Sequence, residues 1–151
     1  MSDNWITLIP EDPRHVPDAV RQELARAWFA GIAPDAGEIE IKVSDQVKFF
    51  DCGTNLKRID CPSCNAEISI QWWQDRMDDD SANGGFTLTR YRTPCCGANH
   101  SLDQLTYEWP QGFARFAVDV RNPNIGRLRD EQKAECEEIL GTKLRVICQC
   151  I

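Results

Sequence analysis

The chain has 151 residues, with 24 acidic against 17 basic side chains and a formal net charge of −7. This length suits one compact domain with its own core, and the acidic balance disfavours a protein that binds duplex nucleic acid through its phosphates. Apolar residues make up 42% of the chain, which disfavours intrinsic disorder.

The first third of the chain alternates strand and helix signals. A short apolar run, Trp5–Ile9, predicts a strand, and after several prolines a helix is expected from about Pro17 to Gly31. Alternation at Ile39–Val43 predicts a second strand, which continues or pairs through Val47–Phe50. The expected apolar side of the helix recurs every four residues: Val16, Val20, Leu24, Trp28 and Ile32.

The last third repeats this order. A strand is predicted at Phe113–Val120, a helix at Asp130–Leu140 and a final strand at Leu144–Ile151. The apolar side of this helix is expected to contain Leu128, Cys136, Ile139 and Leu140. Cys148 and Cys150 share one face of the last strand, so they are poorly placed to bridge each other and are expected to be core thiols.

Strand–helix–strand therefore occurs twice, at 5–50 and 113–151, on either side of a cysteine-bearing stretch at 52–110. This order predicts an α+β fold in one domain over residues 1–151. More closely, it predicts a ferredoxin-like split βαβ sandwich with an inserted zinc-ribbon-like β-hairpin.

The cysteines predict a metal site in the insert. The N-terminus lacks a secretion signal and no run approaches the about 18 apolar residues of a membrane helix, so we expect a cytoplasmic protein with reduced thiols. Cys61-Pro62-Ser63-Cys64 is a metal-binding turn, and Pro94-Cys95-Cys96-Gly97 resembles the second half of one. Four thiolates at Cys61, Cys64, Cys95 and Cys96 would select zinc and close its coordination, which makes the site structural.

Thirty residues separate the two cysteine pairs. We expect strands at Ala66–Trp73 and Phe86–Arg92, joined by a polar turn at Met77–Gly85, to return the second pair to the first. In such a strand, Trp72 and Trp73 would face opposite sides. Aspartates 78–80, with Asp75, are interpreted as a solvated loop rather than a cation site.

Several alternatives stay open at this point. His100 could replace Cys95 as a ligand, and Cys52 could join the site, although a small buried residue is the simpler interpretation. Cys136 is expected in a helix core. The sequence lacks GxxxxGK[ST] and GxGxxG motifs, and no catalytic residue is predicted. Aromatic residues gather around the insert, where a core or a protein interface is favoured over base stacking: Trp72, Trp73, Tyr91, Tyr107, Trp109 and Phe113.

Over roughly residues 45–151, these motifs resemble a family of small bacterial proteins with a CPxC…PCCG insert. The resemblance rests on Phe50–Asn55, the two cysteine motifs, Trp72-Trp73, Tyr107–Phe116 and Leu144–Ile147. It implies a bacterial cytosolic protein without an established activity. Some family members carry a sugar-transporter ATPase label, which the missing phosphate loop does not support here.

The acidic charge and the absence of catalytic motifs predict a non-enzymatic module that binds a basic protein. An immunity or antitoxin protein that neutralises a bacterial toxin such as a nuclease is one form of this hypothesis. Its candidate contacts are Asp78, Asp79, Asp80, Glu137 and Glu138. The alternatives are a small enzyme with a cleft between sandwich and insert, or a single-stranded nucleic-acid binder.

Overall fold

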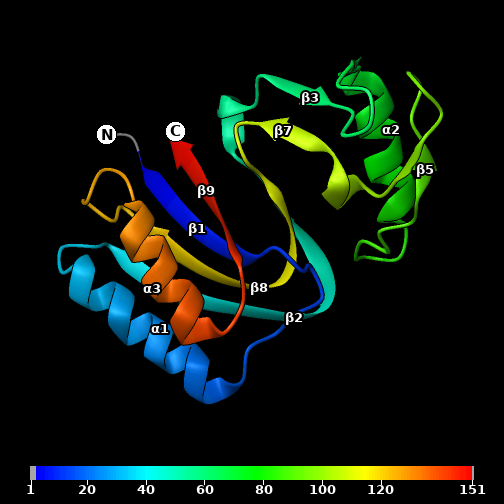
Figure 1. Ribbon diagram of the computed structural model, residues 1–151. Helices are drawn as coiled ribbons and strands as arrows, with labels where there is room; N and C mark the ends of the chain where they lie inside the picture. Colours follow the sequence, from blue (N-terminus) through cyan, green and yellow to red (C-terminus); the bar gives the residue numbers. More distant parts are fainter. Residues whose placement is uncertain (1–2, 151) are drawn as a thin grey trace.

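The computed structural model describes residues 3–150, with the side chain of Cys150 left out. Its main element is a four-stranded antiparallel sheet in the order β2-β8-β1-β9 (Figure 1). The strands are β1 (Asn4–Pro10), β2 (Glu38–Phe50), β8 (Gly112–Arg121) and β9 (Leu144–Cys150). The α+β class is confirmed, and Ile151 of the predicted last strand lies outside the described residues.

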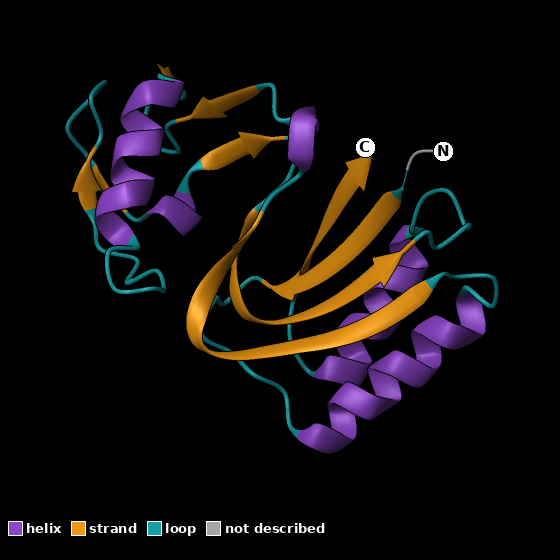
Figure 2. Ribbon diagram, turned by 180° about the vertical axis from the view of Figure 1, so that it is seen from behind, coloured by secondary structure: helices purple, strands orange, loops and turns teal. Residues whose placement is uncertain are grey.

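Two helices, α1 (Ala19–Ile32) and α3 (Asp130–Leu140), cover one face of this sheet (Figure 2). Asp18 caps α1 by accepting a hydrogen bond from the N–H of Arg21 at 2.9 Å, and Gly141 ends α3 in the left-handed conformation (φ 70°). Between the helices and the sheet lies the main core, which contains Ile6, Leu8, Ala25, Phe29, Phe116, Val118, Cys136 and Leu140. Cys148 packs against it, as expected.

The predicted apolar side of α1 is partly wrong. Val20 and Leu24 are 70% and 55% exposed, whereas Ala25 and Phe29 are fully buried. An α-helix has 3.6 residues per turn, so positions four apart advance by about 40° at each step and spiral around the helix. Only Val16, Trp28 and Ile32 of that series reach the core.

The segment between β2 and β8 forms a second, smaller body with its own core (Figure 1). Its elements are η1 (Gly53–Asn55), β3 (Arg58–Asp60), β4 (Glu67–Ile68), α2 (Ile70–Asp80), β5 (Tyr91–Arg92), β6 (Asn99–His100), η2 (Leu102–Gln104) and β7 (Thr106–Glu108). They make a three-stranded sheet, β4-β3-β7, and the two-stranded β5-β6. The long β2, with a register shift between Val43 and Lys48, and β8 lead from the main sheet toward this body.

The predicted long hairpin in the insert is wrong, because the helix α2 replaces the second half of its first strand and the start of its turn. Ser69 starts α2 by accepting a hydrogen bond from the N–H of Trp72 at 3.1 Å. Trp73 and Met77, four residues apart, then face the insert core. Trp72 and Trp73 are consequently helical neighbours rather than residues on opposite faces of a strand. In the second predicted strand, only β5 is extended.

No helix among residues 3–150 has the length and apolar character needed to cross a membrane.

The corrected face of α1 gives a test by paired substitutions. Phe29→Ala should lower the free energy of unfolding by about 3–5 kcal/mol, since it empties a buried site. The matched control, Leu24→Ala, should cost no more than about 0.5 kcal/mol, because Leu24 is exposed. Urea denaturation measures both, and equal losses would contradict the observed burial.

Candidate metal centre

Each cysteine pair lies on a tight turn at the tip of a short hairpin. The β3–β4 hairpin pairs Ile59 with Ile68 and carries the turn 61–66. The β5–β6 hairpin pairs Tyr91 with His100 and carries the turn 93–98. Two separate hairpins therefore bring the cysteines together, in place of the single long hairpin that the sequence predicted.

The two turns have the same backbone hydrogen bonds. In the first, Cys61 N–H donates to Ala66 O and Asn65 N–H donates to Cys61 O, both at 2.9 Å. In the second, Thr93 N–H donates to Ala98 O at 2.9 Å and Gly97 N–H donates to Thr93 O at 3.1 Å. Asn65 (φ 62°) and Gly97 (φ 74°) both adopt the left-handed conformation. The segment Cys-Pro-Ser-Cys-Asn-Ala thus corresponds to Thr-Pro-Cys-Cys-Gly-Ala, position by position.

This correspondence explains why the second pair of cysteines is adjacent. Cys96 occupies the position of Cys64, while Thr93 stands where the first turn has Cys61. Cys95 occupies the position of Ser63. The first turn therefore places its two cysteines at its first and fourth positions, and the second turn places them at its third and fourth. The shared proline and alanine at the second and sixth positions were the sequence signal that could have revealed this.

The four sulfur atoms of Cys61, Cys64, Cys95 and Cys96 lie within 4.8 Å of one another. The Sγ atoms of Cys61 and Cys96 are 3.8 Å apart, and those of Cys64 and Cys95 are 3.4 Å apart. A tetrahedral zinc ion with Zn–S bonds of about 2.3 Å would need sulfur–sulfur distances of about 3.8 Å. The cluster could therefore hold a metal ion, and none of the cysteines described in the structure forms a disulfide.

Hydrogen bonds around the sulfurs favour the thiolate form at two of the four positions. Burial opposes ionisation of Cys61, but the N–H groups of Cys64 and Ser63 outweigh it and lower the pKa of Cys61 to about 6. The Thr93 hydroxyl, 3.6 Å from Cys96 Sγ, and the N–H of Ala98 lower the pKa of Cys96. Thiolate is the form that binds metals.

Hydrogen bonds with the neighbouring sulfurs have the opposite effect on the pKa of Cys64. The N–H of Ala66 lowers the pKa of Cys64, but hydrogen bonds with the thiols of Cys95, Cys96 and Cys61 raise it to about 12. Four thiolates at these distances repel one another, and a divalent cation between them would remove that repulsion.

Neither alternative ligand belongs to the cluster among the described residues. His100 Nε2 lies 2.7 Å from Ser63 Oγ, so it links the second hairpin to the first turn. Cys52 is fully buried, and its thiol donates to Gln111 Oε1 at 3.4 Å. Burial raises the pKa of Cys52, which is the opposite of what activates a cysteine nucleophile. Cys136 is buried in the main core.

Asp80 is the residue whose role sequence reasoning missed. It is 2% exposed, and its carboxylate accepts hydrogen bonds from four groups in residues 87–91, which lead into β5. The donors are Thr87 Oγ1–H, Leu88 N–H, Thr89 N–H and Tyr91 O–H, at 2.8–3.0 Å. The predicted solvated loop is wrong, because all four aspartates lie in α2. Asp75, Asp78 and Asp79 are solvent-exposed as expected, whereas Asp80 ends α2 and fixes the chain that leads to the second hairpin.

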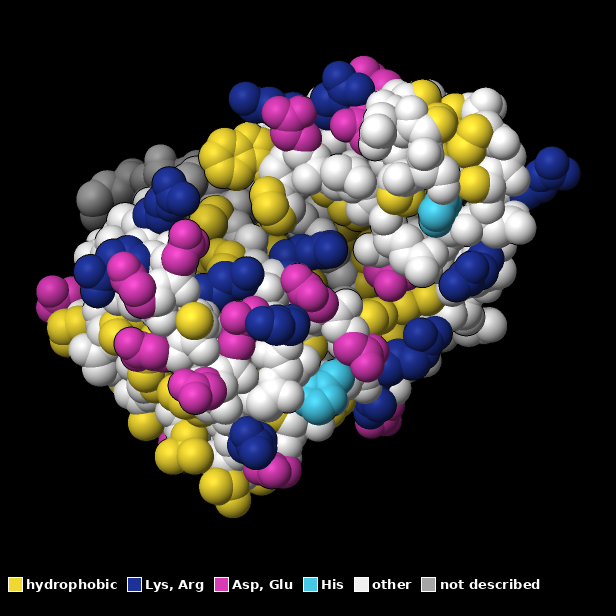
Figure 3. Space-filling view, in the orientation of Figure 1, with side chains coloured by type: hydrophobic (Ala, Val, Ile, Leu, Met, Phe, Trp, Pro, Cys, Tyr) yellow, Lys and Arg dark blue, Asp and Glu magenta, His cyan; other side chains and the backbone are white. Residues whose placement is uncertain are grey.

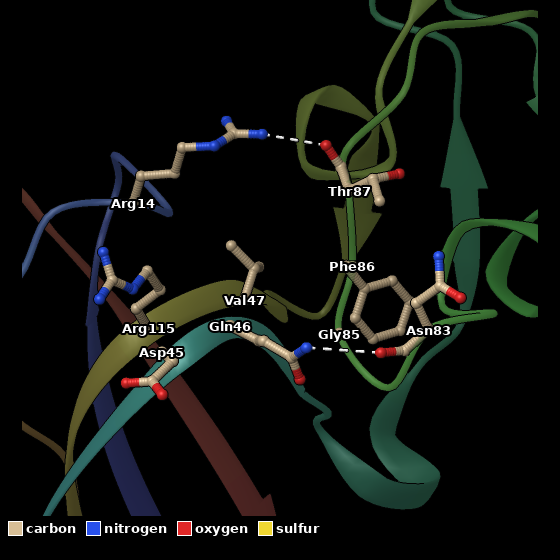
Figure 4. Close-up of a pocket in the computed structure, with 9 residues that line it drawn as sticks. All are labelled: Arg14, Asp45, Gln46, Val47, Asn83, Gly85, Phe86, Thr87 and Arg115. Carbon is tan, nitrogen blue, oxygen red and sulfur yellow. Dashed lines mark hydrogen bonds between the residues drawn. The ribbon is translucent and has the colours of Figure 1, made fainter.

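The space between the main sheet and the insert holds a cavity of about 500 Å³ (Figure 4). Arg14 spans its rim by donating from Nη2 to Thr87 O at 3.0 Å, and Gln46 Nε2 donates to Asn83 O at 3.4 Å. The lining provides one carboxylate, Asp45, and neither a thiol nor an imidazole. It thus lacks the carboxylate pair that would have favoured hydrolytic chemistry in this cleft.

Most of the aromatic side chains of the insert are structural. Trp73 Nε1–H donates to Tyr107 Oη at 3.0 Å, and both rings are buried with Phe113 in the insert core. Trp109 is the exception, at 45% exposed. The expectation of a core is confirmed for these buried rings, whose faces are not open to nucleic-acid bases.

No protein-family model matches the chain, and the comparisons with curated proteins and with solved structures also gave no match.

The Asp80 network gives a stability prediction. Asp80→Ala should lower the free energy of unfolding by about 3 kcal/mol, because buried backbone N–H groups lose a charged acceptor. Asp78→Ala, in the same helix but exposed, should change it by no more than about 0.5 kcal/mol. Denaturation followed by tryptophan fluorescence measures both variants, and a tolerant Asp80→Ala would show that the network is dispensable.

Thiol exposure gives a second prediction. In metal-free, folded protein, Cys96 should be alkylated first, since it is exposed and hydrogen bonds lower its pKa. Cys52 and Cys136 should stay unmodified until unfolding, because both are buried and burial raises their pKa values. Peptide mass mapping after a short pulse of iodoacetamide reads the order, and rapid modification of native Cys52 would instead indicate an activated thiol.

Proposed function

We propose that this chain is a zinc-stapled protein-binding module of the bacterial cytoplasm, without a catalytic role of its own. The observation that carries the proposal is the cluster of four thiols, which joins two hairpins of the insert. The sequence motifs add their resemblance to small bacterial proteins with a CPxC…PCCG insert.

Zinc is the metal that this donor set favours. Thiolates select soft metal ions, and four thiolates in a tetrahedral arrangement are typical of structural zinc. With all four positions taken by cysteine, the ion would keep no coordination site for a reactive water. Its role would then be to fix the two turns relative to each other, and with them the insert.

The strand order supports the finer description of the fold as ferredoxin-like. Two strand–helix–strand units, β1-α1-β2 and β8-α3-β9, form one antiparallel sheet in the order β2-β8-β1-β9. In a split βαβ arrangement, the two strands of each unit are separated in the sheet by one strand of the other unit. Here β8 lies between β1 and β2, and β1 lies between β8 and β9. The zinc-bearing body would be an insert between the two halves, with one metal-binding turn on each of its two hairpins.

The net charge of −7 motivates a basic protein as partner, since opposite charge accelerates association. A toxin such as a nuclease, neutralised by this chain as its immunity protein, fits that chemistry. The candidate contacts narrow to Asp78, Asp79 and Glu138, which are exposed. Asp80 is buried, and Glu137 accepts the N–H of Leu144 at 2.8 Å, so both serve the fold.

Metal analysis tests the zinc proposal. Protein purified under reducing conditions without chelator should contain about one zinc ion per chain, and Cys61→Ser should lose it and destabilise the insert, because metal binding and folding are coupled. Cys136→Ala removes a thiol outside the cluster and should retain the zinc. Absence of zinc from the parent protein, or full zinc retention by Cys61→Ser, would refute the proposal.

Charge substitutions test the partner proposal. The parent chain used as bait at low salt should recover a basic protein from the source bacterium, and binding should weaken as salt rises. A folded, zinc-loaded triple variant, Asp78→Asn, Asp79→Asn and Glu138→Gln, should recover less of the same protein at equal salt. Recovery of no basic partner, or equal recovery by both baits, counts against this surface.

A further inference from the structure

Strand β9 is at the edge of the main sheet, with β1 on one side only (Figure 1). In an antiparallel pair, alternate residues direct their N–H and C=O groups toward and away from the neighbouring strand. Leu144 lies opposite Pro10, which has no N–H to offer, and the N–H of Leu144 donates instead to Glu137 Oε2 at 2.8 Å. The even-numbered residues of β9 therefore direct their backbone groups away from β1.

Two side chains cap this open edge and leave a gap between them. Glu137 takes the N–H of Leu144, and Asn55 Nδ2 donates to Cys148 O at 3.2 Å. Val146 lies midway, and no side chain of the described residues hydrogen-bonds its backbone. Side-chain caps discourage unspecific pairing of sheet edges, and these two leave room for pairing at Val146 between them.

An apolar groove of about 590 Å³ adjoins this gap. Its apolar lining comes from Trp109, Pro110, Leu128, Leu144 and Val146. Figure 3 shows hydrophobic side chains gathered on the face that contains β9, among charged ones. A large exposed aromatic ring beside a groove is typical of protein-binding surfaces, and Trp109 is one of the few large apolar side chains that the described residues expose.

The rim of the groove has more positive than negative charge, although the protein as a whole is acidic. Arg127, Lys133 and Arg145 line it together with Glu11 and Asp130, and Lys133 also pairs with Glu137 at 4.0 Å. Arg145 is oriented by donating from Nη1 to Gln111 O at 2.8 Å. A ligand with a carboxylate beside its apolar groups would match this rim, whereas a second copy of the chain would set two cationic rims and two net charges of −7 against each other.

We propose that an extended segment of a partner protein adds to β9 as a further strand. One residue of the segment would pair with Val146 through two backbone hydrogen bonds, its apolar neighbours would enter the groove, and an acidic residue would face Arg127. Recognition by strand addition takes its specificity from side-chain pockets beside the edge. This inference rests on the proposed binding function and names the segment that the partner would contribute. The small contact implies an affinity on the order of micromolar.

A phage-displayed library of random peptides, selected on the zinc-loaded protein, tests the proposal. Selected peptides should combine alternating apolar residues with an acidic one, and their synthetic forms should bind with measurable affinity by calorimetry. N-methylation at the residue opposite Val146 should weaken binding at least tenfold, because it removes one hydrogen-bond donor. N-methylation of the adjacent residue, whose N–H points away from β9, should have a much smaller effect.

Substitutions in the protein give the complementary test. Val146→Pro removes the outward N–H while leaving the pairing of β9 with β1 intact, and Trp109→Ala removes the apolar contact; each should weaken peptide binding at least tenfold. Val20→Ala, an exposed apolar position on α1, is the matched control and should leave it unchanged. If Val146→Pro does not fold, the N-methylated peptides and Trp109→Ala decide.

Three outcomes would overturn the proposal. One is the absence of any binding peptide, and another is binding that ignores Val146→Pro, Trp109→Ala and backbone methylation. The third is that the parent protein sediments as a dimer and Val146→Pro sediments as a monomer. This result would assign the edge of β9 to a second copy of the chain. In each case, a protein that still contains zinc and still captures a basic partner in a salt-dependent way would support the proposed function. Failure of the strand-addition proposal can therefore be told apart from failure of the proposed function.

Discussion

The insert depends on the convergence of four thiols from two hairpins that are far apart in the chain. The sulfur atoms of Cys61, Cys64, Cys95 and Cys96 gather within 4.8 Å. Thiolates at this distance repel each other, and a cation between them would remove that repulsion, so the cluster could hold a metal ion. A metal ion bound there would tie the two hairpins together and add to the stability that the insert core provides. The main sheet has a separate core under α1 and α3 and does not share this dependence.

Much of this arrangement could be predicted from the sequence, because its signals are local. Alternation and helical periodicity located the sheet strands and α3 to within a few residues, and the cysteine spacing selected the residues that converge. The errors arise where local patterns mislead. Four-residue spacing put the exposed Val20 and Leu24 on the apolar side of α1, and a strand was predicted at 66–73, where Ser69 starts a helix. Asp80 looked like part of a solvated acidic loop, because nothing nearby in sequence shows that it meets Thr87–Tyr91 in space.

The structure also separates parts that stabilise the protein from parts that are free to bind. Thr93 and His100 support the two cysteine-bearing turns, and the rings of Trp73 and Tyr107 are buried in the insert core. The exposed surface includes three of the four aspartates of α2 and the groove beside β9, whose lining has three basic and two acidic side chains. The caps on β9 come from Asn55 and Glu137, which are distant in sequence. Only the folded chain reveals that these two caps flank Val146 on the edge strand.

The central claim is that a metal ion holds the insert together while the main sheet folds on its own core. Hydrogen exchange with and without a zinc chelator measures this most directly. Chelation should raise exchange throughout β3–β7, and most strongly at the N–H groups of Ala66, Asn65 and Gly97 in and beside the two turns. The strands β1 and β8 should keep their protection. Unchanged exchange in the insert after removal of all bound metal would contradict the account.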